Sequence, residues 1–164
     1  MRLIVGLGNP GEKYTSNRHN VGHLAVDALL KRSLPLRGKR NLPQHFVVKK
    51  SDVMMNNSGS FVKKLVEQYR LNSSDLWVIH DDLDIPLGSF KIQKGKGPKL
   101  HNGILSIERE VRTEDFWRVR IGVNNRSPED RTPGEEYVLQ DFSQEEREVL
   151  DKVIEEICKK LATS

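Results

Sequence analysis

Five short polar segments carry side chains that a hydrophobic core does not require. They are Asn9–Gly11, Arg18–Asn20, Asn56–Gly59, His80–Asp84 and His101–Gly103. Their histidines and aspartates can exchange protons, and their asparagines can both donate and accept hydrogen bonds. These residue types permit acid–base chemistry on a substrate held by amides. Each segment also has a structural interpretation, because Asn-Gly and Asn-Pro favour turns, and Asn20 and Ser58 could cap helices.

A glycine motif surrounds the first polar segment and has the spacing of a dinucleotide-binding loop. Gly6, Gly8 and Gly11 spell G-x-G-x-x-G directly after the apolar run Leu3–Val5. In a dinucleotide site the third glycine lies in the first helical turn, and an acidic residue ends the second strand about 20 residues on. Here Pro10 interrupts the motif, and Asp27 falls within an amphipathic pattern. We therefore interpret the glycines as a tight turn that presents Asn9.

The acidic residues after the strand pattern at 75–80 permit a different kind of site. Asp81, Asp82 and Asp84 could hold Mg²⁺, because hard cations bind carboxylate oxygens. No phosphate-binding loop accompanies them in the sequence, so phosphoryl chemistry is the less favoured interpretation. We expect neither a metal ion nor an organic cofactor.

Length and composition limit the organisation of the chain. With 164 residues, 36% of them hydrophobic, it can bury one good core but is too short for separate cofactor and substrate domains. We expect one domain over residues 1–164. Lys and Arg outnumber Asp and Glu by 27 to 23, so an anionic partner is compatible with the charge but not required by it.

The sequence also predicts where the protein works. Cys158 is the single cysteine, which excludes an intramolecular disulfide and fits a reducing compartment. No stretch approaches the roughly 20 apolar residues of a membrane span. The first strand pattern begins at Arg2 and leaves no room for a cleaved signal, so we expect a soluble, cytoplasmic protein.

Strand and helix patterns alternate along the chain. Strands are predicted at 2–7, 45–50, 75–80, 89–94 and 117–123, and helices at 20–32, 58–70, 101–111 and from Ser143 to near the end, with a basic connection at 33–44 and a turn-rich link at 54–59. Asn20 is expected to cap the first helix, and Ser143 with Glu146 forms a capping box for the last. The pattern predicts an α/β domain whose sheet is largely buried. In such sheets, loops beyond the carboxyl ends of strands gather at one crevice, where the polar segments could meet.

The order of the motifs resembles bacterial-type peptidyl-tRNA hydrolases. The matching segments are Gly6–Gly11 (GLGNPG), Tyr14, Arg18–Gly22 (RHNVG), Met55–Asn56 with Ser58–Gly59, Asp81–Asp84 followed by Pro86 and Gly88, His101–Gly103, and Arg118–Gly122 (RVRIG). The resemblance implies a single α/β domain with a twisted mixed sheet flanked by helices. It also implies hydrolysis of the ester that joins a peptide, or an N-blocked amino acid, to the 3′ ribose of tRNA, without a cofactor. The implied enzyme acts as a cytoplasmic monomer with no obligate protein partner.

The resemblance assigns a catalytic role to two residues. His19 matches the family's histidine, and its neutral imidazole can take a proton from a water molecule that attacks the ester. Asp81 matches the carboxylate that stabilises and orients this histidine. The position of His19 beside Asn20 places it near a helix N-terminus, where the partial positive charge is expected to disfavour the imidazolium.

Five other positions match substrate-binding residues of the family. Asn9, Asn56 and Asn102 match asparagines that bind the peptide, and Asn9 is the position associated with distinguishing blocked from free aminoacyl ends. Tyr14 and Met54 match positions beside the tRNA acceptor end, where an aromatic face or a thioether can pack against ribose or base.

A basic segment is available to bind the tRNA backbone. Lys91, Lys94, Lys96 and Lys99 follow one another on a strand and loop, and Arg118 and Arg120 lie on a later strand. Lys91, Lys94 and Arg120 are expected to hold phosphates without reading bases, although a solvated basic face is the structural alternative. The alternative function is a catalytically weakened RNA-binding relative, against which the presence of both His19 and Asp81 argues.

The sequence departs from the family pattern at several places. Gly95–Leu100 carries Pro98, Lys99 and Leu100 where small residues are usual, which places the substrate range in doubt. Gln93 stands where many members carry a basic residue, so Lys91 or Lys94 is expected to substitute for it. Much of a hairpin between residues 34 and 46 is missing and the C-terminus stops early, so we expect a more open crevice.

Overall fold

A five-stranded sheet organises the residues that the computed structural model describes, which are 1–33, 43 and 45–164. The strand order is β2-β1-β3-β5-β4, formed by β1 (Arg2–Gly6), β2 (Phe46–Lys50), β3 (Leu76–Pro86), β4 (Phe90–Lys94) and β5 (Trp117–Asn124). Neighbouring strands are parallel except for β4, which is antiparallel to β5. The predicted mixed sheet is confirmed. The predictions for 33–44 and 34–46 lie largely outside the described residues.

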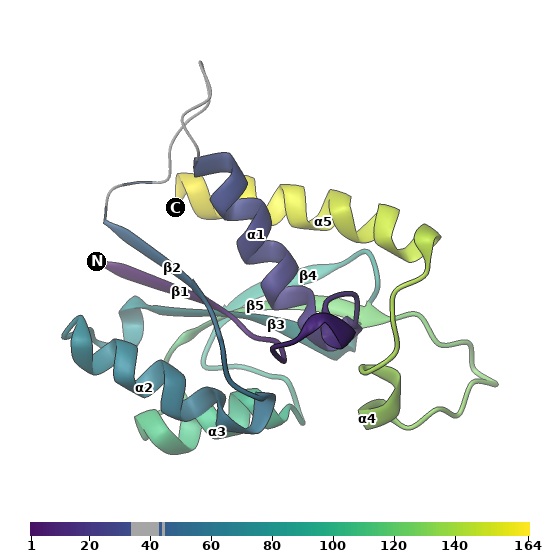
Figure 1. The fold of residues 1–164 in the computed structure, drawn as a ribbon, viewed down its shortest axis with the longest axis horizontal. Coiled ribbons are helices and arrows are strands. Elements are labelled where there is room, and N and C mark those ends of the chain that lie inside the picture. Colours follow the sequence, from purple (N-terminus) through teal and green to yellow (C-terminus); the bar gives the residue numbers. More distant parts are fainter. Residues whose placement is uncertain (34–42, 44) are drawn as a thin grey trace.

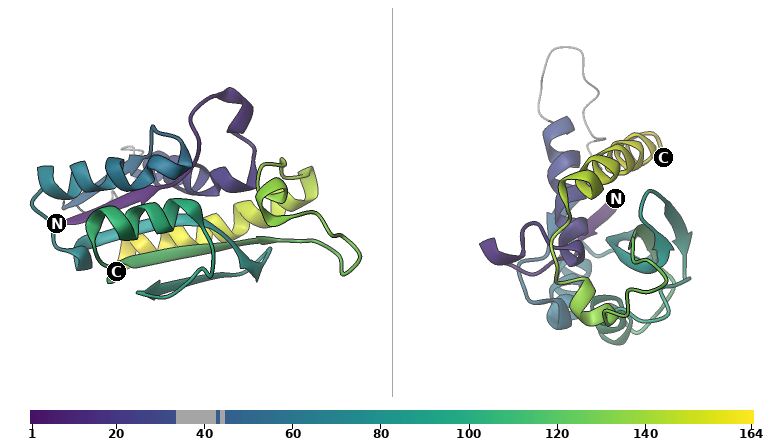
Figure 2. Two further views of the ribbon diagram at one scale, coloured as in Figure 1. Left: turned by 90° about the horizontal axis from the view of Figure 1, so that it is seen from below. Right: turned by 90° about the vertical axis from the view of Figure 1, so that its right-hand side faces the viewer.

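Helices cover both faces of this sheet (Figures 1 and 2). They are α1 (Val21–Ser33), α2 (Ser58–Gln68), α3 (Asn102–Val111), the short α4 (Gly134–Tyr137) and α5 (Gln144–Thr163), with 3₁₀ turns η1 (Glu12–Tyr14), η2 (Arg18–Asn20), η3 (Met55–Asn57) and η4 (Ser73–Asp75). The pair α1 and α5 lies on one face, and α2 and α3 lie on the other. Each described helix is too short or too polar to cross a membrane.

The central strands are apolar on both sides because both faces are covered. Ile4 and Ile79 point toward α1 and α5, where they join one hydrophobic cluster. Their neighbours Leu3, Val5 and Val78 point the other way and join a second cluster with α2 and α3. Alternation along a strand therefore assigns each side chain to one layer, and it also fixes which polar residues share a face at the strand ends.

Strand β3 is longer than its apolar pattern predicts. We expected it to end at His80, before the acidic residues, but it continues to Pro86. Asp81 pairs with Ile121 and Asp82 with Gly122, so β5 supplies the backbone partners of this extension. The acidic residues are tolerated inside the strand because each carboxylate has a polar partner, as described below. The prediction of the strand end was wrong for this reason.

The two predicted helix caps have different outcomes. The capping box of α5 is confirmed, since Ser143 Oγ accepts a hydrogen bond from Glu146 N at 3.1 Å and Glu146 Oε1 accepts one from Ser143 N at 2.9 Å. Asn20 does not cap α1, which continues directly from η2. Its side chain instead binds the backbone N and O of Asn9, both at 2.9 Å. Asn20 thus anchors the loop after β1.

Close packing of α2 on α3 depends on Gly59, whose backbone N donates to Ser106 Oγ at 2.9 Å. A Cβ at Gly59 would collide with the Ser106 carbonyl oxygen. We expect Gly59→Ala to lower the free energy of unfolding by about 1 to 3 kcal/mol, as overpacking does in other cores, even though alanine is the better helix former. Urea unfolding would measure this loss. The exposed Lys64→Ala variant on the same helix is the control, and equal stability of the two variants would contradict the packing argument.

Candidate active site

Residues from distant parts of the sequence meet at the carboxyl edge of the sheet, around a cavity of about 440 Å³. Its lining comes from the loop after β1, from η2 and η3, from the end of β3, from the start of α3 and from α4. Among the predicted site residues, the lining includes Asn9, His19, Met54, Asn56, Asp81 and Asn102. The expected convergence of the polar segments at one crevice therefore occurs.

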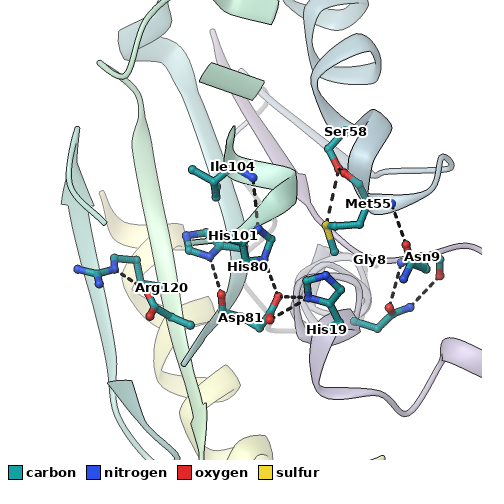
Figure 3. Close-up of polar contacts among 12 residues, drawn as sticks. Gly8, Asn9, His19, Met55, Ser58, His80, Asp81, His101, Ile104 and Arg120 are labelled. Carbon is teal, nitrogen blue, oxygen red and sulfur yellow. Dashed lines mark hydrogen bonds and ion pairs between the residues drawn. The ribbon is translucent and has the colours of Figure 1, made fainter. Parts of the chain in front are cut away.

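Asp81 is the centre of the polar contacts in this cavity (Figure 3). Asp81 is 2% exposed, and two histidine rings lie within hydrogen-bond distance of its carboxylate. His19 Nδ1 lies 2.9 Å from both carboxylate oxygens, and His101 Nε2 lies 2.8 Å from Oδ1. Two imidazoles therefore stabilise the buried negative charge of Asp81. One comes from η2 and the other from the position just before α3.

The protonation pattern of His101 follows from its second contact. Its Nδ1 accepts a hydrogen bond from Ile104 N at 3.2 Å, so this nitrogen carries a lone pair and the side chain acts as the N-cap of α3. The proton of the neutral ring is therefore on Nε2, where it is donated to Asp81. In the sequence, His101 belongs to the His101–Gly103 motif without an assigned role. A helix-capping position next to a polar segment was the signal that it had one.

Burial and hydrogen bonding act in opposite directions on the two catalytic candidates. Burial favours the neutral form of Asp81, but His19 and His101 outweigh it and hold the pKa of the carboxyl well below its usual range. Burial also lowers the pKa of His19, but the charge of Asp81 and its hydrogen bond raise it by more. The expectation that a helix N-terminus would disfavour the imidazolium of His19 is therefore wrong, because the Asp81 carboxylate dominates.

His80 is a third histidine in this region, next to His101, and it remains neutral. It lies on the opposite face of β3 from Asp81, is fully buried, and its Nδ1 donates to the Asp81 carbonyl oxygen at 2.8 Å. Its Nε2 has no hydrogen-bond partner among the described residues. Burial and the nearby His101 lower the pKa of His80 to about 3. It therefore adds no positive charge next to His101 at neutral pH.

Asn9 is held in place by the protein on one side and faces the cavity on the other. Asn20 fixes its backbone, and its Oδ1 accepts a hydrogen bond from Met55 N at 2.8 Å. Behind this loop, Ser51 Oγ donates to the Gly8 carbonyl oxygen and lies 3.2 Å from His23 Nε2. Because its oxygen is already bonded, Asn9 offers a ligand mainly its NH₂ group.

The remaining predicted substrate residues occupy different positions. Met54, Asn56 and Asn102 are exposed and line the cavity from η3 and the start of α3. Tyr14 lies in η1, is partly buried and is not among the lining residues. Lys13 Nζ lies 4.8 Å from the centre of the Tyr14 ring. The structure thus brings three of these four side chains to the cavity and leaves Tyr14 outside it.

The three predicted phosphate-binding residues do not form one cluster. Lys91 is exposed on β4, whereas Lys94 points to the opposite face and its Nζ lies 3.3 Å from Asp115. Arg120 is 8% exposed, and its guanidinium donates at 2.7 Å to both Asp82 and Gln93. Because this guanidinium is already bonded within the protein, a phosphate contact by Arg120 stays a prediction. The positive charge of Arg120 balances the buried Asp82.

The acidic residues of β3 do not converge on a common ion. Asp82 binds Arg120, and Asp84 Oδ2 accepts from Lys99 N at 3.0 Å. A set with metal-ligating atoms does exist in His19, Asp81 and His101, whose ligand atoms lie within 4.8 Å of one another. These groups are already hydrogen-bonded together, so an ion would have to replace those bonds. As it stands, the arrangement suits proton transfer.

Similar sequences and a similar fold occur in proteins of one family. The model of the family "Peptidyl-tRNA hydrolase" matches residues 3–164. The chain belongs to this family. A peptidyl-tRNA hydrolase of Dehalococcoides mccartyi is 38% identical over 94% of the chain and 87% of that protein, and one of Mycoplasmopsis synoviae is 39% identical over 94% and 84%. The crystal structure of the Acinetobacter baumannii peptidyl-tRNA hydrolase superposes with a TM-score of 0.82 at 28% identity, over 98% of this chain and 86% of that one.

The dependence of His19 on Asp81 can be measured directly. In an Asp81→Asn variant the negative charge is lost while burial remains, so the pKa of His19 should fall below its value in the unmodified protein. Titration of the ring protons by NMR would record the change. His23, whose pKa is lowered by burial and Lys50 on the far side of the Asn9 loop, should titrate as before. An unmoved His19 would contradict the coupling.

Proposed function

We propose that this chain hydrolyses the ester between a peptide, or an N-blocked amino acid, and the 3′ ribose of tRNA, and so returns the tRNA for use. The observation that carries the proposal is the bond from His19 Nδ1 to Asp81. It commits one ring nitrogen to the carboxylate and leaves Nε2 as the base for a water molecule in the cavity. Membership of the peptidyl-tRNA hydrolase family supports the substrate.

The reaction follows from this geometry in two steps. His19 Nε2 takes a proton from water while the water oxygen adds to the ester carbonyl carbon. The resulting tetrahedral intermediate then breaks its bond to the ribose 3′ oxygen, and the imidazolium returns the proton to that oxygen. Asp81 stabilises the imidazolium in between, and His101 holds Asp81 in position. The raised pKa of His19 makes it a stronger base once it is deprotonated.

Asparagines of the cavity wall are proposed to bind the peptide backbone. Asn9, Asn56 and Asn102 carry no charge, so they suit peptides of many sequences. Because Met55 N occupies Oδ1 of Asn9, the free NH₂ group can donate to an acyl carbonyl. An N-blocked amino acid carries such a carbonyl on its α-nitrogen, whereas a free aminoacyl group has an amino group there without a carbonyl. We assign to Asn9 the discrimination between them, and to Tyr14 and Met54 contacts with the acceptor end.

The tRNA body is proposed to bind along β4. Lys91 is exposed on β4 and lies on the same face of the sheet as Arg120, its partner on β5. We propose that Lys91 contacts a phosphate of the tRNA. Lys94 is expected to contribute less, because it faces the other side of the sheet and is paired with Asp115.

We propose that the enzyme is a cytoplasmic monomer whose residues 1–164 form a single domain. The one continuous sheet supports the single domain. The substrate, a product of translation, is a cytoplasmic molecule.

His19→Ala tests the chemistry. We expect kcat to fall by about 10² to 10⁴, which is the usual effect of losing a general base, with little change in tRNA affinity. Release of N-acetyl amino acid from N-acetyl-aminoacyl-tRNA measures turnover. In the unmodified enzyme the rate should decline as the pH falls through the raised pKa of His19, because the base is then protonated.

Two controls accompany this measurement. His45→Ala removes an exposed histidine just before β2 and should leave turnover unchanged. Free aminoacyl-tRNA should be a poor substrate for the unmodified enzyme. Turnover of the His19→Ala variant at a comparable rate would refute the assignment and favour a weakened RNA-binding relative.

Lys91→Ala tests the tRNA surface separately from the chemistry. We expect a higher KM with nearly unchanged kcat, because a remote phosphate contact binds ground and transition states alike. The slope of log affinity against log salt should flatten by about 0.7 to 0.9 for the one lost contact. Lys94→Ala is the matched comparison and should change both quantities less. Equal effects of the two variants would show that the face of β4 does not decide tRNA binding.

A further inference from the structure

The mouth of the active-site cavity collects exposed apolar side chains. Among the described residues, the large apolar side chains with high exposure are Met1, Leu30, Met54, Leu100, Leu105, Leu139 and Val149. Three of them, Met54, Leu100 and Leu139, line this one cavity. Leu100 is 77% exposed, the highest value among them. Exposed apolar surface gathered at one opening is typical of a binding site.

Leu100 and Leu139 are placed by the same bonds that hold the catalytic pair. Leu100 directly precedes His101, whose Nε2 binds Asp81. Leu139 directly follows Val138, whose carbonyl oxygen accepts a hydrogen bond from His19 N at 2.8 Å. Both leucines therefore neighbour residues that hold the catalytic pair, and both line the same cavity as His19 and Asp81.

Leu83 and Val138 complete this apolar surface. Leu83 lies two residues after Asp81 on β3 and approaches the start of α4, where a Cβ at Gly134 would contact its Cδ1. Asp84 binds Lys99 N and so fixes the loop that carries Leu100. We refer to Leu83, Leu100, Val138 and Leu139 as the apolar subsite. The asparagines come from other elements, namely the loop after β1, η3 and α3, and in Figure 1 α4 stands apart from α2 and α3.

Building on the proposed function, we infer that the apolar subsite binds the side chain of the peptide's last residue, the one esterified to tRNA, and favours an apolar side chain there. We place the backbone of this residue at the asparagines and its ester carbonyl at His19, which leaves the leucine wall of the cavity for its side chain. The RNA is a less suitable occupant, because the exposed carboxylates of Asp84 and Glu135 line the same cavity and repel phosphates. Lys99 also lines it but offsets only one of them.

The experiment compares two esters of the same tRNA, one carrying N-acetyl-leucine and the other N-acetyl-alanine. Each kcat/KM is divided by the spontaneous hydrolysis rate of that ester, which removes the difference in intrinsic reactivity. We expect about a tenfold preference for the leucyl ester, the range that apolar pockets achieve for a few methylene groups. In the double variant Leu100→Ser with Leu139→Ser, the preference should fall to between one and two.

Leu105→Ser is the matched control, because Leu105 is a leucine of α3 that is 45% exposed and is not among the cavity-lining residues. It should retain the full preference. Equal normalised rates for the two esters with the unmodified enzyme would overturn the inference, while their hydrolysis would still uphold the proposed function. A double variant that weakens both esters by the same factor would also overturn it and would assign the leucines to the RNA. Failure to hydrolyse either ester would instead refute the proposed function, and the inference with it.

Discussion

A negative charge buried inside a β-strand is the constraint on which the site depends. Removing a carboxylate from water costs several kcal/mol unless partners compensate, and Asp81 is 2% exposed. Two histidines supply the compensation, and each is held by the fold in turn, His101 by the first turn of α3 and His19 by backbone bonds of η2. The stability of the carboxylate and the basicity of His19 therefore have one cause. A neighbouring buried carboxylate, Asp82, is balanced separately by Arg120, which keeps the two charges from competing for partners.

Much of the architecture could be predicted because the apolar pattern records it. Continuous apolar runs marked β1 and β3 as central strands, and the capping box marked the start of α5. What failed were places where tertiary partners replaced local preferences. Asp81 and Asp82 looked like the end of a strand because their partners are 20 or more residues away in sequence, and no local signal announces them. Asn20 looked like a helix cap, but its side chain was used to hold Asn9.

Motifs predicted the site to a similar degree. They could not show which charged side chains are already paired within the protein. His19, Asp81 and Asn9 could be named because they match motifs of the family that the sequence resembles, and their residue types allow the chemistry that the resemblance implies. An arginine in a sequence gives no sign of whether its charge is already paired, and only the structure shows that Arg120 is bonded to Asp82 and Gln93. Lys94 was grouped with Lys91 although odd and even positions of a strand face opposite sides. The role of His101 depends on a contact with Asp81 that only the packed structure reveals.

The three consecutive residues Arg18, His19 and Asn20 show why the site tolerates little change in register. The guanidinium of Arg18 donates to the Tyr137 carbonyl and binds Glu146 at 3.0 Å, which fastens η2 to α4 and α5. His19 binds Asp81 at the end of β3, and Asn20 clamps Asn9 after β1. A 3₁₀ turn points successive side chains about 120° apart, so adjacent residues can reach three different elements. A shift by one residue would send the imidazole toward the wrong element, leave the Asp81 charge without His19, and release the amide that faces the substrate.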